Sequence, residues 1–179
     1  MRFVKRVFCR CFQGVFRLAI PVLPYKTPAG LNGIDQIPDL LVQRQIGRVL
    51  LVTDEAVEAC GLTRPLERAL AEKHIAVAVY DKTVANPTTQ NVEEARQVYT
   101  ENGCQALIGF GGGSSIDCAK IVGARVVKPK QPVAKMKGLL KIHKKLPLLI
   151  AVPTTAGTGS ETTLAAVITD SDTRHKFPI

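Results

Sequence analysis

Short apolar runs alternate with amphipathic stretches from residue 48 to the end of the chain. The apolar runs predict buried strands, at residues 48–54, 76–81, 105–110 and 147–153. The stretches between them have the spacing of helices, at residues 62–74, 91–102 and 114–127. A further run at 164–170 is typical of one more strand. This alternation predicts an α/β fold of Rossmann-like type, a mainly parallel sheet with helices on both faces.

The first twenty residues follow a different pattern. Apolar side chains fall at positions 3, 4, 7, 8, 11, 12, 15 and 16, which lie on one face of a helix, and most basic side chains lie elsewhere. We therefore expect a basic amphipathic helix over 1–20, followed by an α/β domain over 21–179. Such a helix could lie on an anionic membrane surface or dock on its own protein or a partner subunit. The sequence favours neither alternative.

The net charge of +9 is confined to two segments of the 179-residue chain. Residues 1–20 hold five basic side chains and no acid, and residues 128–145 hold seven lysines and no acid. The rest of the chain is slightly acidic, so a basic surface for nucleic acid is not supported. We expect segment 128–145 to be an exposed helix or loop.

Cysteine usage and hydropathy indicate a cytoplasmic protein. The five cysteines are odd in number and irregularly spaced, which indicates reduced thiols rather than a disulfide framework. Cys9 and Cys11 lack the partner residues of a zinc site. No apolar run approaches the roughly 20 residues that span a bilayer. The expected location is the cytoplasm, peripheral to a membrane if residues 1–20 bind one.

A glycine-rich segment, GFGGGSSIDCAK at 109–120, follows one expected strand and opens the next helix. Without Cβ atoms, Gly111, Gly112 and Gly113 let a ligand approach the backbone closely. Ser114 or Ser115 can cap the helix, whose first N–H groups and dipole suit an anion such as a pyrophosphate. The alternative is a tight structural turn.

Two more features follow expected strands and should gather at the same edge of the sheet. The segment VPTTAGTGSET at 152–162 offers the hydroxyls of Thr154, Thr155 and Thr158, which suit ribose and phosphate oxygens or simply a capped turn. Asp54 ends the run LLVTD, where a carboxylate can accept both adenosine ribose hydroxyls and repel a 2′-phosphate. This favours NAD over NADP, unless Asp54 only caps a helix or turn.

No catalytic group is apparent. The three histidines, His74, His143 and His175, are far apart and show no ligand spacing, so we expect them to face solvent. No nucleophile elbow, HExxH or paired-carboxylate pattern occurs in the sequence. The chain shows features for binding a cofactor and none for the reaction.

Taken together, GGGSSIDCAK, PTTAGTGSE and the NPT at 86–88 resemble the iron-dependent (group III) alcohol dehydrogenases. The resemblance covers about residues 25–179, the cofactor half of that family. It implies a Rossmann-like NAD-binding domain, followed by a helical domain that holds Fe²⁺ or sometimes Zn²⁺. It also implies hydride transfer between the cofactor and a small alcohol or aldehyde, in a homo-oligomer when complete.

The resemblance also assigns site residues. It places Asp54 at the adenosine ribose, Asn86 near the nicotinamide end and Lys176 near the cofactor ribose. It places the pyrophosphate at Gly111, Gly112, Gly113 and Ser114, and the nucleotide border at Thr154, Thr155 and Thr158. The family's metal ligands, one Asp and three His, lie beyond the last residue here, and Asp117 is expected to be structural.

These departures indicate a truncated, catalytically incomplete dehydrogenase without metal ligands of its own. Two alternatives stay open. One is a relative of glycerol dehydrogenase or dehydroquinate synthase, although the wording TTAGTGSE favours the alcohol dehydrogenases. The other is a non-catalytic nucleotide-binding module anchored by residues 1–20.

Overall fold

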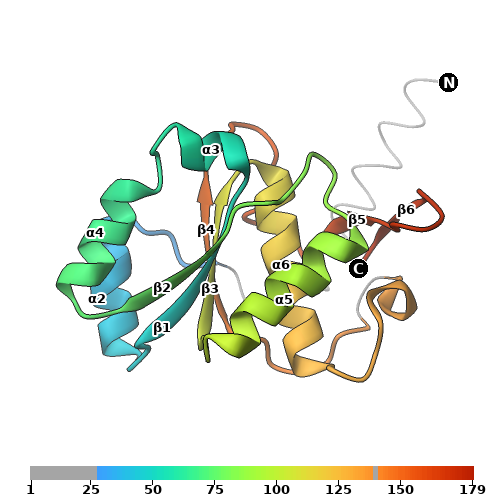
Figure 1. Cartoon of the computed structure of the whole chain (residues 1–179), viewed down its shortest axis with the longest axis horizontal. Helices are drawn as coiled ribbons and strands as arrows, with labels where there is room; N and C mark the ends of the chain where they lie inside the picture. Colours follow the sequence, from blue (N-terminus) through green and yellow to red (C-terminus); the bar gives the residue numbers. More distant parts are fainter. Residues whose placement is uncertain (1–27, 139–140) are drawn as a thin grey trace, which may run out of the picture.

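The computed structural model describes residues 28–138 and 141–179, so the expected helix at 1–20 lies outside the described residues. Its centre is a parallel sheet with the strand order β2-β1-β3-β4 (Figure 1). The bounds are Arg48–Val52 for β1, Ala76–Tyr80 for β2, Ala106–Gly111 for β3 and Leu148–Pro153 for β4. The predicted fold class is confirmed.

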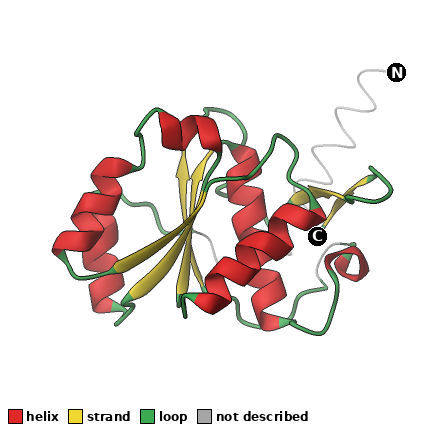
Figure 2. Cartoon of the chain, viewed as in Figure 1, coloured by secondary structure: helices red, strands yellow, loops and turns green. Residues whose placement is uncertain are grey.

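Helices cover both faces of this sheet (Figure 2). On one face lie α2 (Gln36–Gln43) and α4 (Arg64–Glu72), and on the other lie α5 (Thr89–Glu101) and α6 (Gly113–Val127). A short helix, α3 (Glu55–Ala59), follows β1 directly. The sequence analysis missed α2 and α3, because helices of eight and five residues show too little periodicity to detect.

The core is aliphatic and lies in two layers, because successive strand residues point to opposite faces. Val49 and Leu51 of β1 pack toward α2 and α4, whereas Leu50 and Val52 pack toward α5 and α6. All four side chains are fully buried. A strand buried on both faces reads as a continuous apolar run, which is why the sequence revealed it.

The run at 164–170 contains a strand, as predicted, but the strand is shorter than the run and does not join the parallel sheet. Only Val167–Thr169 is extended, as β5, and it pairs antiparallel with β6 (Lys176–Pro178) in a separate hairpin. The intervening turn is closed by the Asp170 carboxylate, which accepts from the N–H groups of Asp172 and Thr173. So short a connection allows only antiparallel pairing, since a parallel partner needs a long crossover.

The lysine-rich segment 128–145 is largely loop, as expected. Its one regular element is a single 3₁₀ turn, η2 (Val133–Met136), among the residues described there. Val133 and Met136 are buried and hold the segment against the domain, while most of the lysines are exposed.

The strand order predicts a ligand-binding crevice at the carboxyl end of the sheet. The chain leaves β1 through α3 and α4 on one face, but leaves β2 and β3 through α5 and α6 on the other. Because β1 and β3 are neighbours, the segments that follow them diverge, and this switch point is where open α/β sheets bind ligands.

Candidate cofactor site

The N-terminus of α6 lies in this crevice. The helix begins at Gly113, with Gly112 as N-cap, and has no side-chain cap. The expectation that Ser114 or Ser115 caps it is wrong, because both hydroxyls bind other segments. Ser114 Oγ accepts from the Asn86 N–H at 3.2 Å, and Ser115 Oγ donates to Asp54 Oδ2 at 3.3 Å. The uncapped helix end therefore retains its capacity for an anion.

The three consecutive glycines have different reasons to lack a side chain. Gly111 has a φ of 141°, and a Cβ there would lie 2.7 Å from Ser115 Oγ. A Cβ on Gly113 would lie 2.9 Å from Ser160 Oγ. At Gly112 φ is −73°, and a Cβ would meet only Thr155 Oγ1, at 3.4 Å. The fold itself therefore requires glycine at 111 and 113, whereas at 112 a methyl group would make only an ordinary contact with the Thr155 hydroxyl among the described residues.

Asp54 follows β1 and links two elements of the crevice. Its Oδ1 accepts from the Val57 N–H at 3.0 Å and caps α3, which is the alternative role considered from the sequence. Its Oδ2 accepts from Ser115 across the switch point. The side chain is only half-buried, and each carboxylate oxygen has a second lone pair, so the group can still accept from a ligand.

The threonine-rich loop after β4 covers the glycines. The Thr154 N–H donates to Gly111 O at 2.9 Å, which joins the ends of β3 and β4. Thr155 reaches Gly112, and Thr158 lies against Gly113. All three threonines are exposed, so their hydroxyls border the helix end without being buried by it.

Asn86 and Lys176 meet beside Ser114 at the start of α6. Asn86 lies after β2 in the left-handed region, with a φ of 60°, and its Oδ1 accepts from Lys176 Nζ at 2.7 Å. Both residues are exposed. Through Asn86 and Ser114, the lysine on β6 is connected to the start of α6.

The structure thus brings all ten predicted positions together in one connected cluster at the carboxyl end of the sheet. Neighbouring members are linked by close approaches to the glycines and by hydrogen bonds to acceptors on Asp54, Asn86 and Gly111. Their individual contacts with a cofactor remain predictions.

Lys120 is a structural residue of this region that the sequence analysis missed. Its Nζ donates to Thr163 O and Oγ1, both at 3.0 Å, and to Ala165 O at 3.2 Å. Burial lowers the pKa of Lys120, although Asp117 one turn earlier opposes the shift. Asp117 Oδ2 accepts from the Val167 N–H, consistent with its expected structural role. The two side chains anchor the chain that leaves the threonine-rich loop.

The described residues offer no metal centre. In 28–138 and 141–179 no three His, Cys, Asp or Glu side chains gather closely enough to hold an ion. His74, His143 and His175 are exposed, as expected. Cys60, Cys104 and Cys118 are free thiols. Over the same ranges, no helix has the length and apolar character needed to cross a bilayer.

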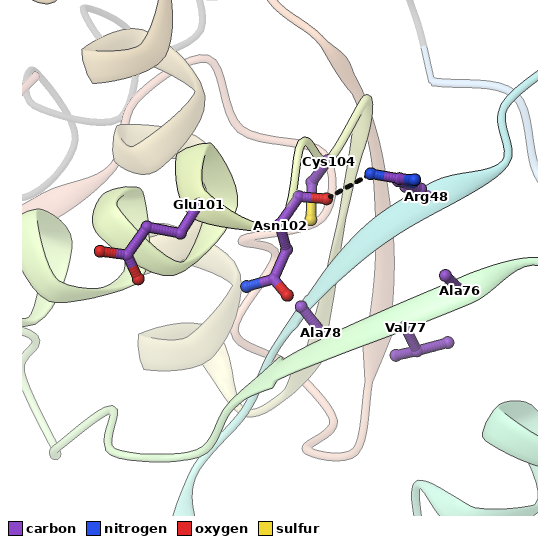
Figure 3. A pocket seen from close by; sticks show the side chains of 7 residues that line it. All are labelled: Arg48, Ala76, Val77, Ala78, Glu101, Asn102 and Cys104. Atoms are coloured by element: carbon purple, nitrogen blue, oxygen red, sulfur yellow. Dashed lines mark hydrogen bonds between the residues drawn. The ribbon is translucent and has the colours of Figure 1, made fainter.

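A hollow of about 290 Å³ lies at the opposite end of the sheet (Figure 3). Its walls come from the amino ends of β1 and β2 and the end of α5. Arg48 donates to Asn102 O there at 3.5 Å, beside Cys104. Burial raises the pKa of the Cys104 thiol, so the protonated form is favoured. The hollow contains neither a helix N-terminus nor a glycine-rich turn, and it is separate from the candidate site.

Comparison with known proteins identifies the family. The sequence pattern of iron-containing alcohol dehydrogenases matches residues 24–179, most of the chain. The chain belongs to this family. The NAD-dependent methanol dehydrogenase of Bacillus methanolicus is 33% identical over 157 residues, which cover 88% of this chain and 41% of that enzyme. The resemblance noted from the motifs is therefore confirmed.

Solved structures support the same family assignment. A 1,3-propanediol oxidoreductase superposes with a TM-score of 0.81 at 31% identity, over 87% of this chain and 41% of the other. Sulfoacetaldehyde reductase from Bifidobacterium kashiwanohense, solved in complex with NAD⁺, superposes with a TM-score of 0.73 at 28% identity, over 87% of this chain and 42% of the other. The chain thus spans about two fifths of the length of the family members it matches.

Proposed function

We propose that this chain is the NAD-binding part of an alcohol dehydrogenase that transfers a hydride between a nicotinamide cofactor and a small alcohol or aldehyde. The observation that carries the proposal is the N-terminus of α6 at the switch point of the sheet, with Gly112 as N-cap and no side-chain cap from the described residues. A pyrophosphate suits such a helix end because backbone N–H groups and the helix dipole both favour an anion.

The ten predicted residues have the chemistry needed along a dinucleotide. Asp54 is suited to the adenosine ribose hydroxyls, and its charge disfavours a 2′-phosphate. The glycines and Ser114 suit the pyrophosphate, and Thr154, Thr155 and Thr158 offer hydroxyls beside it. Asn86 and Lys176, which are hydrogen-bonded to each other, would face the nicotinamide half.

When bound, the nicotinamide accepts or supplies the hydride. This chain contributes the binding and orientation of the cofactor. The metal of the family, Fe²⁺ or Zn²⁺, finds no ligand set among the described residues. A small alcohol or aldehyde is proposed as substrate, because the relatives include a methanol dehydrogenase and a lactaldehyde reductase.

Gly112→Ala tests the cofactor site without disturbing the fold. Its φ of −73° suits alanine, and the nearest atom to the new methyl is 3.4 Å away. The methyl group would add bulk at the N-cap position, next to the first free N–H groups of α6. We expect NAD⁺ affinity, measured by calorimetry, to fall about tenfold or more, which corresponds to about 1.4 kcal/mol.

Gly47→Ala is the matched control. Gly47 precedes β1 at the opposite end of the sheet, and a Cβ there would approach only Gln105 Oε1, at 4.0 Å. Gly47→Ala should bind NAD⁺ like the unsubstituted chain. Both variants should keep the melting temperature of the unsubstituted chain. Equal NAD⁺ affinity of the two variants, or no NAD⁺ binding by the folded unsubstituted chain, would disprove the proposal.

The cytoplasm is the proposed location, because the described cysteines are free thiols. We also propose a homo-oligomer for the complete protein, as the family resemblance implies. Size-exclusion chromatography with light scattering would test the second point. A membrane or partner contact through residues 1–20 stays a prediction from the sequence.

A further inference from the structure

The loop that carries Asn86 is attached to an element more than eighty residues away in the sequence. Thr169 of β5 donates its N–H to Pro87 O at 2.8 Å, and Thr88 forms a bridge with Thr169. Two residues later, Ser171 binds the start of α5. Its hydroxyl accepts from Thr89 Oγ1 at 2.9 Å and from the Gln90 N–H at 3.1 Å.

The contact between these elements is reciprocal. The Ser171 N–H donates back to Thr89 Oγ1 at 3.1 Å, so the two hydroxyl residues exchange hydrogen bonds. Ser171 thereby also satisfies one of the free N–H groups in the first turn of α5, beside the cap supplied by Thr88. We call the Ser171–Thr89 pair the clasp.

The hairpin that supplies the clasp is firmly held. Ile168 and Phe177 are buried in the core layer formed with α5 and α6. The Val167 N–H donates to Asp117 of α6 at 2.9 Å. Ser171 lies in the turn that joins β5 and β6, so the clasp connects the Asn86 loop to a fixed part of the domain.

On its other side, the loop is held by a buried amide. Asn91 Nδ2 donates to Lys82 O at 2.9 Å and to the Tyr80 hydroxyl at 3.0 Å, while its Oδ1 accepts from the Thr88 N–H. Asn91 is 7% exposed. Both ends of the loop are thus fixed. Its tip at Asn86 is exposed and, among the described residues, forms hydrogen bonds with Ser114 and Lys176 alone.

We infer that Ser171 is a positioning residue for the Asn86 loop, and through it for the nicotinamide half of the bound cofactor. The inference rests on the proposed function. Loss of the Ser171 hydroxyl removes two of the bonds that fix the start of α5 and the end of the loop. Asp54, at the adenosine end of the site, forms no hydrogen bond with the clasp among the described residues, and its carboxylate bonds to α3 and α6. Its backbone pairs with Lys82 at the start of the loop, the end that Asn91 fixes rather than the end that the clasp fixes.

The test compares NAD⁺ with ADP, which lacks the nicotinamide half. Calorimetry on the 179-residue chain would measure both affinities for Ser171→Ala, Ser171→Thr and the control Asp172→Ala. Asp172 is exposed, and within the described part of the chain only its backbone N–H is hydrogen-bonded. For Ser171→Ala we expect NAD⁺ to bind about fivefold more weakly, the effect of about one net hydrogen bond, with ADP binding unchanged.

The companion variants and a second readout make the result decisive. Ser171→Thr, which keeps the hydroxyl, and Asp172→Ala should bind both ligands normally. Amide hydrogen exchange at Asn86 and Thr88 should be faster in Ser171→Ala alone. Unchanged NAD⁺ binding, or equal loss of NAD⁺ and ADP, would overturn the inference. Failure of the unsubstituted chain to bind NAD⁺ would instead refute the proposed function, and this inference with it.

Discussion

Replacing Lys120 by methionine should destabilise the domain, because this lysine is a buried connector rather than a surface charge. Its side chain is 14% exposed, and that of Asp117 beside it is 13% exposed. The ammonium group donates three hydrogen bonds to residues 163 and 165 and lies 3.7 Å from Asp117 Oδ1. Methionine retains most of the apolar stem but none of the donors or the charge.

The expected loss of stability depends on which of the lysine's acceptors water can reach in the variant. Thr163 is exposed, so water can replace the lysine at both of its oxygens. Ala165 O is half-buried, and Asp117 Oδ1 has no hydrogen bond to any other described residue. The variant loses one charge-assisted hydrogen bond and the positive charge beside Asp117, but it no longer has to bury an ammonium group. Together these changes should lower the free energy of unfolding by about 2 kcal/mol. For a chain of this length that lowers Tm by about 4–8 °C.

Urea denaturation and thermal melts would measure the change, with Lys130→Met as control. Lys130 is exposed and forms no hydrogen bond or ion pair within the described part of the chain, so its variant should stay within about 0.5 kcal/mol of the unsubstituted chain. In the double variant with Asp117→Asn, the two losses should be less than additive, since they remove one shared interaction. A Lys120→Met cost below about 0.5 kcal/mol, or full additivity, would refute the reasoning.

Two further predictions concern the inner side of α6. Gly109→Ala should cost about 2 kcal/mol in urea denaturation, because its Cβ would lie 3.1 Å from Ile116 Cα. Gly30→Ala should cost little, because its Cβ would have no atom of the described residues within 4 Å. Burial raises the pKa of the Cys118 thiol from 9 to about 12, so the native state keeps a proton that the unfolded chain releases. Stability should therefore fall as pH rises from 9 to 12, by at most about 1.4 kcal/mol per unit. Cys118→Ala should flatten that slope, and Cys60→Ala, at an exposed thiol, should not.

The sheet and its longer helices were predictable because their pattern is long and repeated. Each strand of the parallel sheet is an apolar run, and α5 and α6 extend for 13 and 15 residues. The hairpin was not predictable, because three-residue strands show no period and their pairing depends on the Asp170 turn. The cap of α6 was predicted from residue type alone, and the serines proved to serve other segments.

The sequence predicted the residues of the candidate site, but not the residues that hold them in place. Glycines, threonines and an aspartate at strand ends signal the crevice, since carboxyl ends of parallel strands share one edge. Lys120 binds a segment 43 residues away, and Thr89 binds one 82 residues away. No spacing in a single sequence reports such contacts. The exception is Asp117 and Lys120, whose separation of three residues on a helix would have indicated a common face.

The close approach of α6 to β3 at Gly109 has a consequence for affinity. The helix backbone packs directly against the strand, with no room for a side chain between them at Gly109. A diphosphate meeting its N–H groups would therefore find them pre-organised, and little conformational entropy would be lost on binding there. The exposed segments around Asn86 and Thr155 would order more on contact, so a bare diphosphate fragment should retain a disproportionate share of the whole dinucleotide's binding free energy.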